Sequence, residues 1–92
     1  MRILVTPTFQ RTAKKLHRRQ KAALDEAVRA VAAQPDVGET KVGDLAGVKV
    51  YKFPMGKLHC LLAYRVLDEH TLKLLMVGPH ENFYRDLKRR ED

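Results

Sequence analysis

The chain has only one cysteine and no apolar run long enough to cross a bilayer. Cys60 lies in an apolar stretch and has no second cysteine to pair with, which excludes a disulfide within the chain. We therefore expect a small buried side chain in a reducing compartment. The strand-like segment after Met1 is not followed by the apolar core of a secretory signal. These absences indicate a cytoplasmic protein without a membrane partner.

The residue patterns of several common catalytic sites are also missing. The four histidines, His17, His59, His70 and His80, are scattered and do not have the spacing of zinc ligands. The sequence contains neither a glycine-rich phosphate-binding loop nor a nucleophile elbow. We therefore expect neither a bound metal nor a cofactor.

Positive charge is the most distinctive property of the composition. The chain has 18 lysines and arginines against 11 acidic residues, a net charge of +7. This excess points to a polyanionic or acidic partner. Ribosomal, DNA-binding and acidic-protein-binding domains share it, so charge alone leaves the class of partner open. The 92 residues are expected to form one domain, 1–92, with one modest core.

The apolar segment Thr71–Val77 predicts a central strand that is buried on both faces. Gly78 and Pro79 are expected to end this strand, and a helix is expected over residues 81–90. His80 then lies between a rigid strand and a helix, where a side chain is held firmly yet stays exposed. Such a position suits a general acid or base. The alternative is a histidine that caps the helix or is merely exposed.

The first half of the chain predicts one strand followed by helices. Residues 2–6 form a short β-branched run that Pro7 ends, which indicates an edge strand. Apolar residues recur at helical spacing over 9–16 and again over 20–33. The basic run 14–21 is read as a helix end, a turn and a helix start, although one long kinked helix remains open. Residues 34–45 are punctuated by glycine and proline and predict an irregular loop.

Two further strands are expected over 48–53 and 57–67, with a turn at Pro54–Gly56. Alternation along the second strand predicts a core face and a mixed face, which is apolar in its middle and basic at its ends. The core set is Leu58, Cys60, Leu62, Tyr64 and Val66. The mixed set is Lys57, His59, Leu61, Ala63 and Arg65.

These elements predict an α+β fold. Its small antiparallel sheet would contain the N-terminal strand and a three-stranded meander, with a helical pair on one face and a C-terminal helix. The other face is expected to be partly open and basic. Because His80 ends the central strand, this face is the candidate site.

Three stretches carry a resemblance to a known family: LAGVKVYKF (45–53), LLAYRVLDEHTLKLLMVG (61–78) and PHENFYRDLKR (79–89). Their order and spacing resemble the RelE/ParE superfamily of toxins from bacterial type II toxin–antitoxin pairs, over nearly the whole chain. The resemblance implies a RelE-like fold and a cognate antitoxin as the cytoplasmic partner in a hetero-oligomer. Antitoxins of the family often cover or displace the C-terminal helix, so Phe83 and Leu87 are the expected contact region.

The resemblance implies two different activities. RelE-like members cleave mRNA in the ribosomal A site, where they contact 16S rRNA, whereas ParE-like members inhibit DNA gyrase and are not nucleases. Lys52 matches the RelE-like lysine that holds phosphate, but Pro54 and Leu61 stand where RelE-like toxins have basic residues. The strand end Gly78-Pro79-His80, followed by an aromatic residue, is similar to the histidine-using, YafQ-like branch. A non-catalytic binding module is the third alternative.

Cleavage of this kind uses the RNA's own 2′-hydroxyl as the nucleophile and needs no metal. It needs a base, an acid and cations for the developing phosphate charge. His80 is the candidate base or acid, His59 a second acid or ligand, and Lys52 a cation. The candidate substrate-binding residues are Lys57, Arg65, Phe83, Tyr84 and Arg85, of which Tyr84 or else Phe83 would stack on a base.

Each candidate also has a purely structural alternative. The two lysines would then be solvated side chains, His59 a structural histidine and Tyr84 a core residue. Arg65 would pair with an acid such as Glu69.

Overall fold

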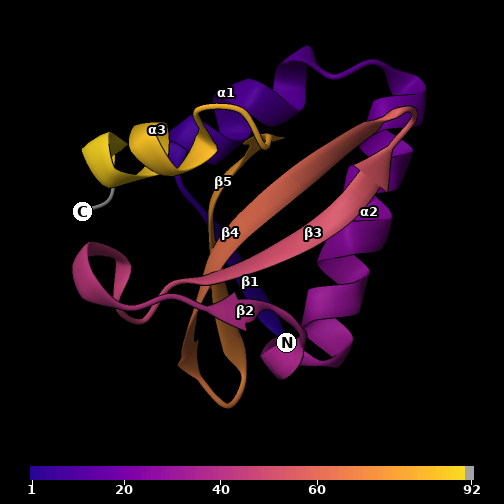
Figure 1. Cartoon of the computed structure of the whole chain (residues 1–92). Helices are drawn as coiled ribbons and strands as arrows, with labels where there is room; N and C mark the ends of the chain where they lie inside the picture. Colours follow the sequence, from indigo (N-terminus) through magenta and orange to yellow (C-terminus); the bar gives the residue numbers. More distant parts are fainter. Residues whose placement is uncertain (91–92) are drawn as a thin grey trace.

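Five strands form one sheet in the order β1-β5-β4-β3-β2, with three helices packed on it (Figure 1). The structure is a computed structural model that describes residues 1–90, with Arg90 described by its backbone only. The strands are β1 (Arg2–Val5), β2 (Glu39–Thr40), β3 (Lys49–Met55), β4 (Leu58–Asp68) and β5 (Thr71–Pro79). The helices are α1 (Pro7–Lys15), α2 (Arg18–Ala33) and α3 (Phe83–Arg90), with short 3-10 turns η1 (Pro35–Val37) and η2 (Gly43–Leu45). The predicted α+β class is confirmed.

The sheet is mixed, which corrects the expectation of an antiparallel one. Strands β3, β4 and β5 form the predicted antiparallel meander. β1 lies at an edge as predicted, but it runs parallel to β5, with Arg2 opposite Thr71. The pattern of a short strand shows that it can pair but not in which direction. The interval 34–45, expected to be irregular, contributes β2, whose Glu39 pairs with Val50 on the opposite edge.

The basic run 14–21 contains a break between two helices, so the alternative of one kinked helix is wrong. Leu16 ends α1 in an extended conformation, and the His17 N–H donates to Oε1 of Gln20 at the start of α2 (3.0 Å). α1 is capped by Thr6, whose Oγ1 accepts from the Phe9 N–H at 3.0 Å. None of the helices that the structure describes is long and apolar enough to cross a membrane.

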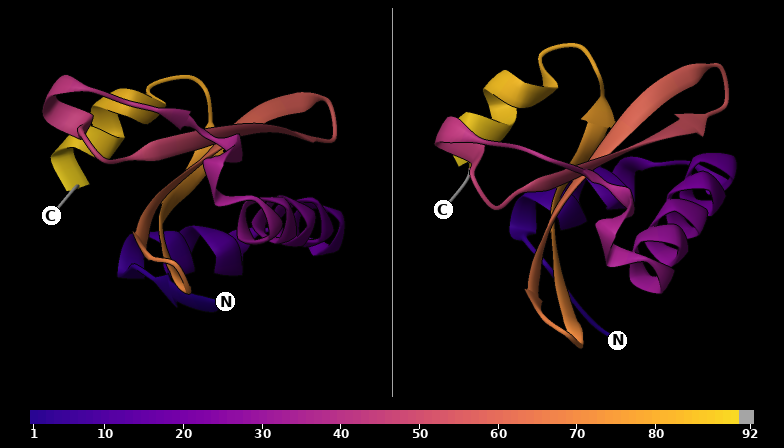
Figure 2. Two further views of the ribbon diagram at one scale, coloured as in Figure 1. Left: turned by 90° about the horizontal axis from the view of Figure 1, so that it is seen from below. Right: turned by 60° about the horizontal axis from the view of Figure 1, so that its bottom comes forward.

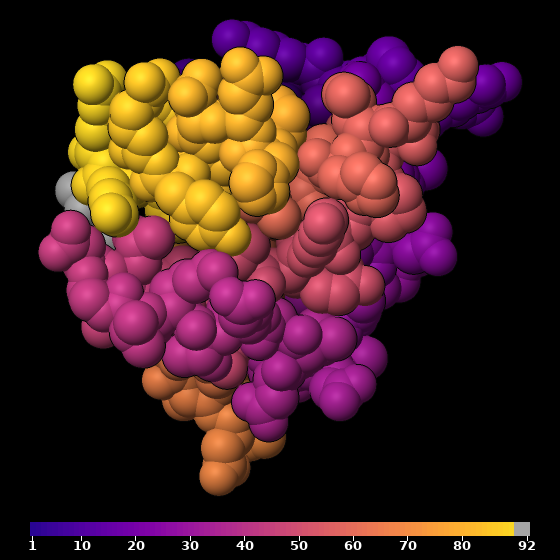
Figure 3. All heavy atoms as spheres, in the orientation of Figure 1, coloured from indigo at the N-terminus to yellow at the C-terminus, as the bar shows by residue number. Residues whose placement is uncertain are grey.

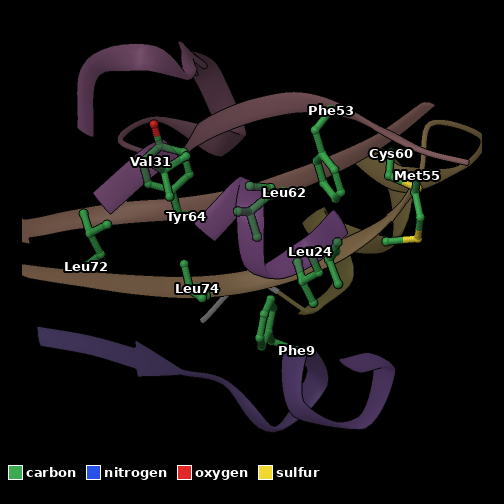
Figure 4. Close-up of a cluster of buried hydrophobic side chains, with 12 residues drawn as sticks. Phe9, Leu24, Val31, Phe53, Met55, Cys60, Leu62, Tyr64, Leu72 and Leu74 are labelled. Atoms are coloured by element: carbon green, nitrogen blue, oxygen red, sulfur yellow. The ribbon is translucent and has the colours of Figure 1, made fainter. Parts of the chain in front are cut away.

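The first core lies between the sheet and the α1–α2 pair (Figure 4). Of the core face predicted for β4, Cys60, Leu62 and Tyr64 are buried as expected. Leu58 and Val66 are 56% and 39% exposed, because they lie near the ends of a long strand whose middle the helices cover. The remaining members of this core are Phe9, Leu24, Ala27, Val31, Phe53, Met55, Leu72, Leu74 and Val77.

A second core covers most of the face that was expected to be partly open. α3 packs there, on the side of the sheet opposite α1 and α2 (Figure 2). Phe83 and Leu87 are each 1% exposed and pack with Leu61 and Ala63, the apolar middle of the mixed face. Burial of these four side chains is what holds the short C-terminal helix. Lys52 and His59, which lie on the same face, remain exposed.

The connection from β5 to α3 differs from the expectation by two residues at each end. β5 continues to Pro79, which is tolerated because β1 covers β5 only from Thr71 to Leu74. α3 starts at Phe83, after Asn82 adopts the left-handed conformation (φ 61°). This turn carries His80 away from the sheet.

Candidate functional site

A cleft of about 370 Å³ lies where the N-terminal end of α3 meets strands from the other half of the sheet. On the face shown in Figure 3, the segment around β2, the β3–β4 hairpin and α3 come together. The residues that line the cleft are Glu39, Lys41, Val50, Lys52, Leu61, His80 and Tyr84. Its volume is in the range of small-ligand sites. Three of the predicted site residues, Lys52, His80 and Tyr84, are therefore brought together.

Strand register places Lys52 and His80 on the same side of the sheet. Lys52 is opposite Leu61 on β4, and Leu61 is opposite Gly78 on β5. Because neighbouring strands are about 4.8 Å apart, the backbones of Lys52 and Gly78 are roughly 10 Å apart. His80 follows Gly78 by two residues, so its side chain reaches the cleft from the rim. Val50 and Leu61 form the apolar floor between the cation and the imidazole.

The His80 ring contacts the ring of Tyr84 edge to face, with centroids 6.0 Å apart and planes at 82°. The His80 side chain makes no hydrogen bond within residues 1–90; its backbone carbonyl accepts from the Phe83 N–H at 3.2 Å. His80 is therefore an exposed imidazole supported by one aromatic neighbour, not a side-chain cap. Tyr84 is half-buried, with one side of its ring in the cleft.

Lys41 is a cleft residue that the sequence did not reveal. Its Nζ lies 2.5 Å from Oε1 of Glu39 and 4.9 Å from the centroid of the Tyr84 ring. The hydrogen bond to Glu39 raises the pKa of Lys41, and the same bond lowers the pKa of Glu39. Glu39 is the first residue of the two-residue strand β2, and Lys41 directly follows that strand. A lone lysine in such a segment carries no periodic signal that would have singled it out.

His59 and Lys57 lie at the rim, outside the cleft lining. His59 is opposite Pro54 near the end of the β3–β4 hairpin, two residues before Leu61 and on the same face. Lys57 is in the turn of that hairpin, and both side chains are exposed. Within residues 1–90, neither forms a hydrogen bond, ion pair or ring contact with His80 or Lys52. A ligand longer than the cleft would reach them along this face.

Phe83, Arg65 and Arg85 lie elsewhere. Phe83 is 1% exposed in the second core, so the expectation that it could stack on a base is wrong. Arg65 donates from Nη1 to the carbonyl of Ala46 at 3.2 Å and holds the segment around η2, four residues along β4 from Leu61. Arg85 is on the exposed side of α3, 3.9 Å from Asp86.

The sequence profile of a family described as the ParE-like toxin of type II bacterial toxin–antitoxin systems matches residues 3–88. The chain belongs to this toxin family. Among curated protein sequences, none matches the toxin at a significant level.

Solved structures share the toxin's fold. A chain of the RelBE2 toxin–antitoxin complex from Mycobacterium tuberculosis is 32% identical, with a TM-score of 0.66 over 86% of this chain and 96% of that chain. A double variant of E. coli RelE in the free state has a TM-score of 0.74 at 18% identity, over 99% of this chain and 97% of that chain. A chain of the intact E. coli RelBE complex has a TM-score of 0.70, also at 18% identity, over 87% of this chain and 96% of that chain.

The cleft of the toxin combines four chemical properties in a small volume. It has an imidazole, two ammonium groups, an aromatic ring and one carboxylate. The imidazole, the ammonium groups and the ring would suit a phosphate that is attached to a planar base, whereas the carboxylate would oppose its binding. The apolar floor leaves the charged groups at the rim, where they are accessible to a polymer.

Proposed function

We propose that this toxin is a ribosome-dependent endoribonuclease that cleaves mRNA in the A site and so inhibits translation. The observation that carries the proposal is the cleft shared by His80, Lys52 and Tyr84. A protein that acts only by binding a partner has no need for an exposed imidazole, a cation and a half-buried ring on one small cleft.

The chemistry would run without a metal. His80 would take the proton from the 2′-hydroxyl, or give one to the leaving 5′-oxygen. The Lys52 ammonium would neutralise the negative charge that grows on the phosphate in the transition state. Tyr84 would stack on the base beside the cleaved bond and so fix its position. His59 and Lys57 would contact the RNA further along the same face.

The charge of the α1–α2 junction supports contact with ribosomal RNA. Five cations surround it, and no acidic residue occupies the first turn of α2, where a carboxylate would favour the helix dipole. Within the described part of the chain, none of the five has an ion-pair partner. They are Lys14, Lys15, Arg18, Arg19 and Lys21. An array of free cations suits the phosphates of 16S rRNA.

The cognate antitoxin is the proposed protein partner. The net charge of +7 favours a disordered acidic segment, which would gain association rate from electrostatic attraction. α3 is a suitable target, because Phe83 and Leu87 are its buried residues in the described structure and Tyr84 packs beside them. Displacing it would expose apolar surface that an antitoxin could cover and would separate Tyr84 from the cleft.

Inhibition of DNA gyrase is the second candidate. The observation in its favour is that Pro54 and Leu61 stand where, by the resemblance, RelE-like toxins have basic residues, so this face of the sheet would carry fewer cations than in a RelE-like nuclease. The two candidates differ in their requirement for His80.

Primer extension on a cellular mRNA after induction of the toxin tests the proposal. A ribosome-dependent nuclease produces cuts in register with the codons. A gyrase inhibitor produces none and instead blocks supercoiling of a relaxed plasmid by purified gyrase. Absence of codon-phased cuts with loss of supercoiling would replace the first candidate with the second.

A further inference from the structure

The ion pair between Lys41 and Glu39 joins two side chains of very different solvent exposure. The Lys41 side chain is 22% exposed, whereas that of Glu39 is 75% exposed. Lys41 is fixed by its surroundings: its N–H donates to the carbonyl of Val48 at 2.9 Å, and its Nζ lies over the Tyr84 ring. The carboxylate is therefore the member of the pair that is free to leave.

Strand pairing places this carboxylate beside the second cation of the cleft. Glu39 is opposite Val50, and Lys52 follows Val50 by two residues on the same face. Glu39, Lys41 and Lys52 all line the cleft, and Glu39 is the one acidic residue among the described residues of its lining. Two ammonium groups and one carboxylate thus line the same cleft as His80 and Tyr84, and the carboxylate is paired with Lys41.

We propose that Lys41 is a phosphate-binding residue of this cleft and that Glu39 occupies the phosphate position in the free toxin. This inference rests on the proposed function, because the phosphate would belong to the RNA. A carboxylate and a phosphate both present anionic oxygens to an ammonium group, and the phosphate can contact Lys52 at the same time. The substrate would displace Glu39, which would move into solvent.

The displacement is energetically feasible. An exposed ion pair changes an equilibrium constant by no more than about fivefold. A phosphate that contacts two ammonium groups, one of them partly desolvated against an aromatic ring, gains more than that. Glu39 would thus lower the affinity of the cleft for single anions. The affinity for a polymer would be lowered less, because a polymer also binds other cations of the toxin.

Binding of inorganic phosphate, followed by NMR shifts of the Lys41 and Tyr84 amides, tests the inference without any cleavage. Glu39→Gln is expected to lower the Kd for phosphate about three- to tenfold, since it removes the competing ion pair and its negative charge. Lys41→Gln is expected to raise the Kd by a similar factor. In the double variant, Glu39→Gln should bring less gain than it does alone.

A matched control is available in the ion pair between Lys88 and Asp44, 3.9 Å apart and outside the cleft lining. Asp44→Asn changes the net charge by the same amount, and we expect it to leave the Kd within a factor of two of wild type. An equal gain from Asp44→Asn would overturn the inference, because net charge would explain it. An unchanged Kd in Glu39→Gln, with unfolding temperature preserved, would also overturn it.

The cleavage assay separates this inference from the proposed function. Glu39→Gln could raise the phosphate affinity in a Lys41-dependent way while the toxin cuts no mRNA. That result would support the anion site and refute the proposed nuclease activity. Loss of mRNA cleavage in Glu39→Gln without any change in phosphate binding would assign Glu39 to the chemistry and overturn the displacement.

Discussion

The imidazole of His80 lies edge to face against the ring of Tyr84, 6.0 Å between centroids, although one residue is in the turn after β5 and the other belongs to α3. The contact couples the candidate catalytic group to the position of α3. Because α3 is anchored by Phe83 and Leu87, the second core contributes to the geometry of the cleft. Any partner that moves α3 would therefore change the cleft as well.

Tyr84 tests the aromatic part of the cleft. Tyr84→Ala is expected to lower the rate of mRNA cleavage by roughly ten- to a hundredfold, since base stacking contributes about 1–3 kcal/mol. Tyr84→Phe retains the ring and should keep most of the activity. Single-turnover cleavage on programmed ribosomes measures both. Equal loss in the two variants would show that the hydroxyl, not the stacking surface, is required.

Lys52 and His59 are both exposed on the same face, yet only Lys52 lines the cleft. Lys52→Ala should reduce cleavage by at least tenfold, because a cation near the developing phosphate charge is lost. His59→Ala should have a smaller effect. Antitoxin binding should be retained in both variants, which shows that they are folded. A larger loss from His59→Ala would move the site towards the β3–β4 hairpin.

Tyr64 connects the sheet to η1 through a buried hydroxyl. It donates to the carbonyl of Pro35 at 2.7 Å and accepts from the Gly38 N–H at 2.9 Å. Tyr64→Phe leaves both groups unsatisfied and should lower the free energy of unfolding by about 1–3 kcal/mol. Urea unfolding measures it, with Tyr51→Phe as the control, since the Tyr51 hydroxyl makes no hydrogen bond in the described part of the chain. Equal stabilities of the two variants would contradict a stabilising role for the hydrogen bonds of the Tyr64 hydroxyl.

The pH dependence of Tyr64 has a defined sign. Burial raises the pKa of this phenol above its ordinary value of 10.0. The neutral form is thus favoured in the folded state, and the associated stability is present below pH 10 and is lost as pH rises above it. In Tyr64→Phe, the decrease in the free energy of unfolding above pH 10 should be smaller than in wild type.

Asn82 adopts φ 61° in the turn that carries His80. Asn82→Gly should leave the free energy of unfolding within about 0.5 kcal/mol, because glycine accepts this conformation without strain. Asn82→Ala should cost about 1 kcal/mol. Urea denaturation compares the two. Identical stabilities would mean that the turn relaxes to another conformation.

The sequence predicted the strands correctly where the apolar pattern extends over many residues. The apolar alternation from Leu58 to Leu67 and the buried run Thr71–Val77 mark two neighbouring strands, and the second of them leads to His80. His80 was found because Gly78 and Pro79 follow the apolar pattern. Lys52 was singled out by the likeness to known toxins and lies within β3.

The short strand β2 and the burial of the second sheet face by α3 were not predicted, for physical reasons. β2 has two residues and exists only through its pairing with β3, so the Lys41–Glu39 pair had no local signal. Leu61 and Ala63 looked like part of an open face because alternation shows which side chains share a face, not what covers that face. α3, eight residues long, buries them through Phe83 and Leu87.

The most direct test compares mRNA cleavage by the wild-type toxin and His80→Ala on programmed ribosomes, with His70→Ala as the control. His70 is an exposed histidine in the β4–β5 turn and is outside the cleft lining. We predict codon-phased cuts by wild type and His70→Ala, and a rate about a hundred- to ten-thousandfold lower for His80→Ala with unchanged antitoxin affinity. Full cleavage by His80→Ala, or no codon-phased cleavage by wild type, would contradict the assignment of this cleft to RNA hydrolysis.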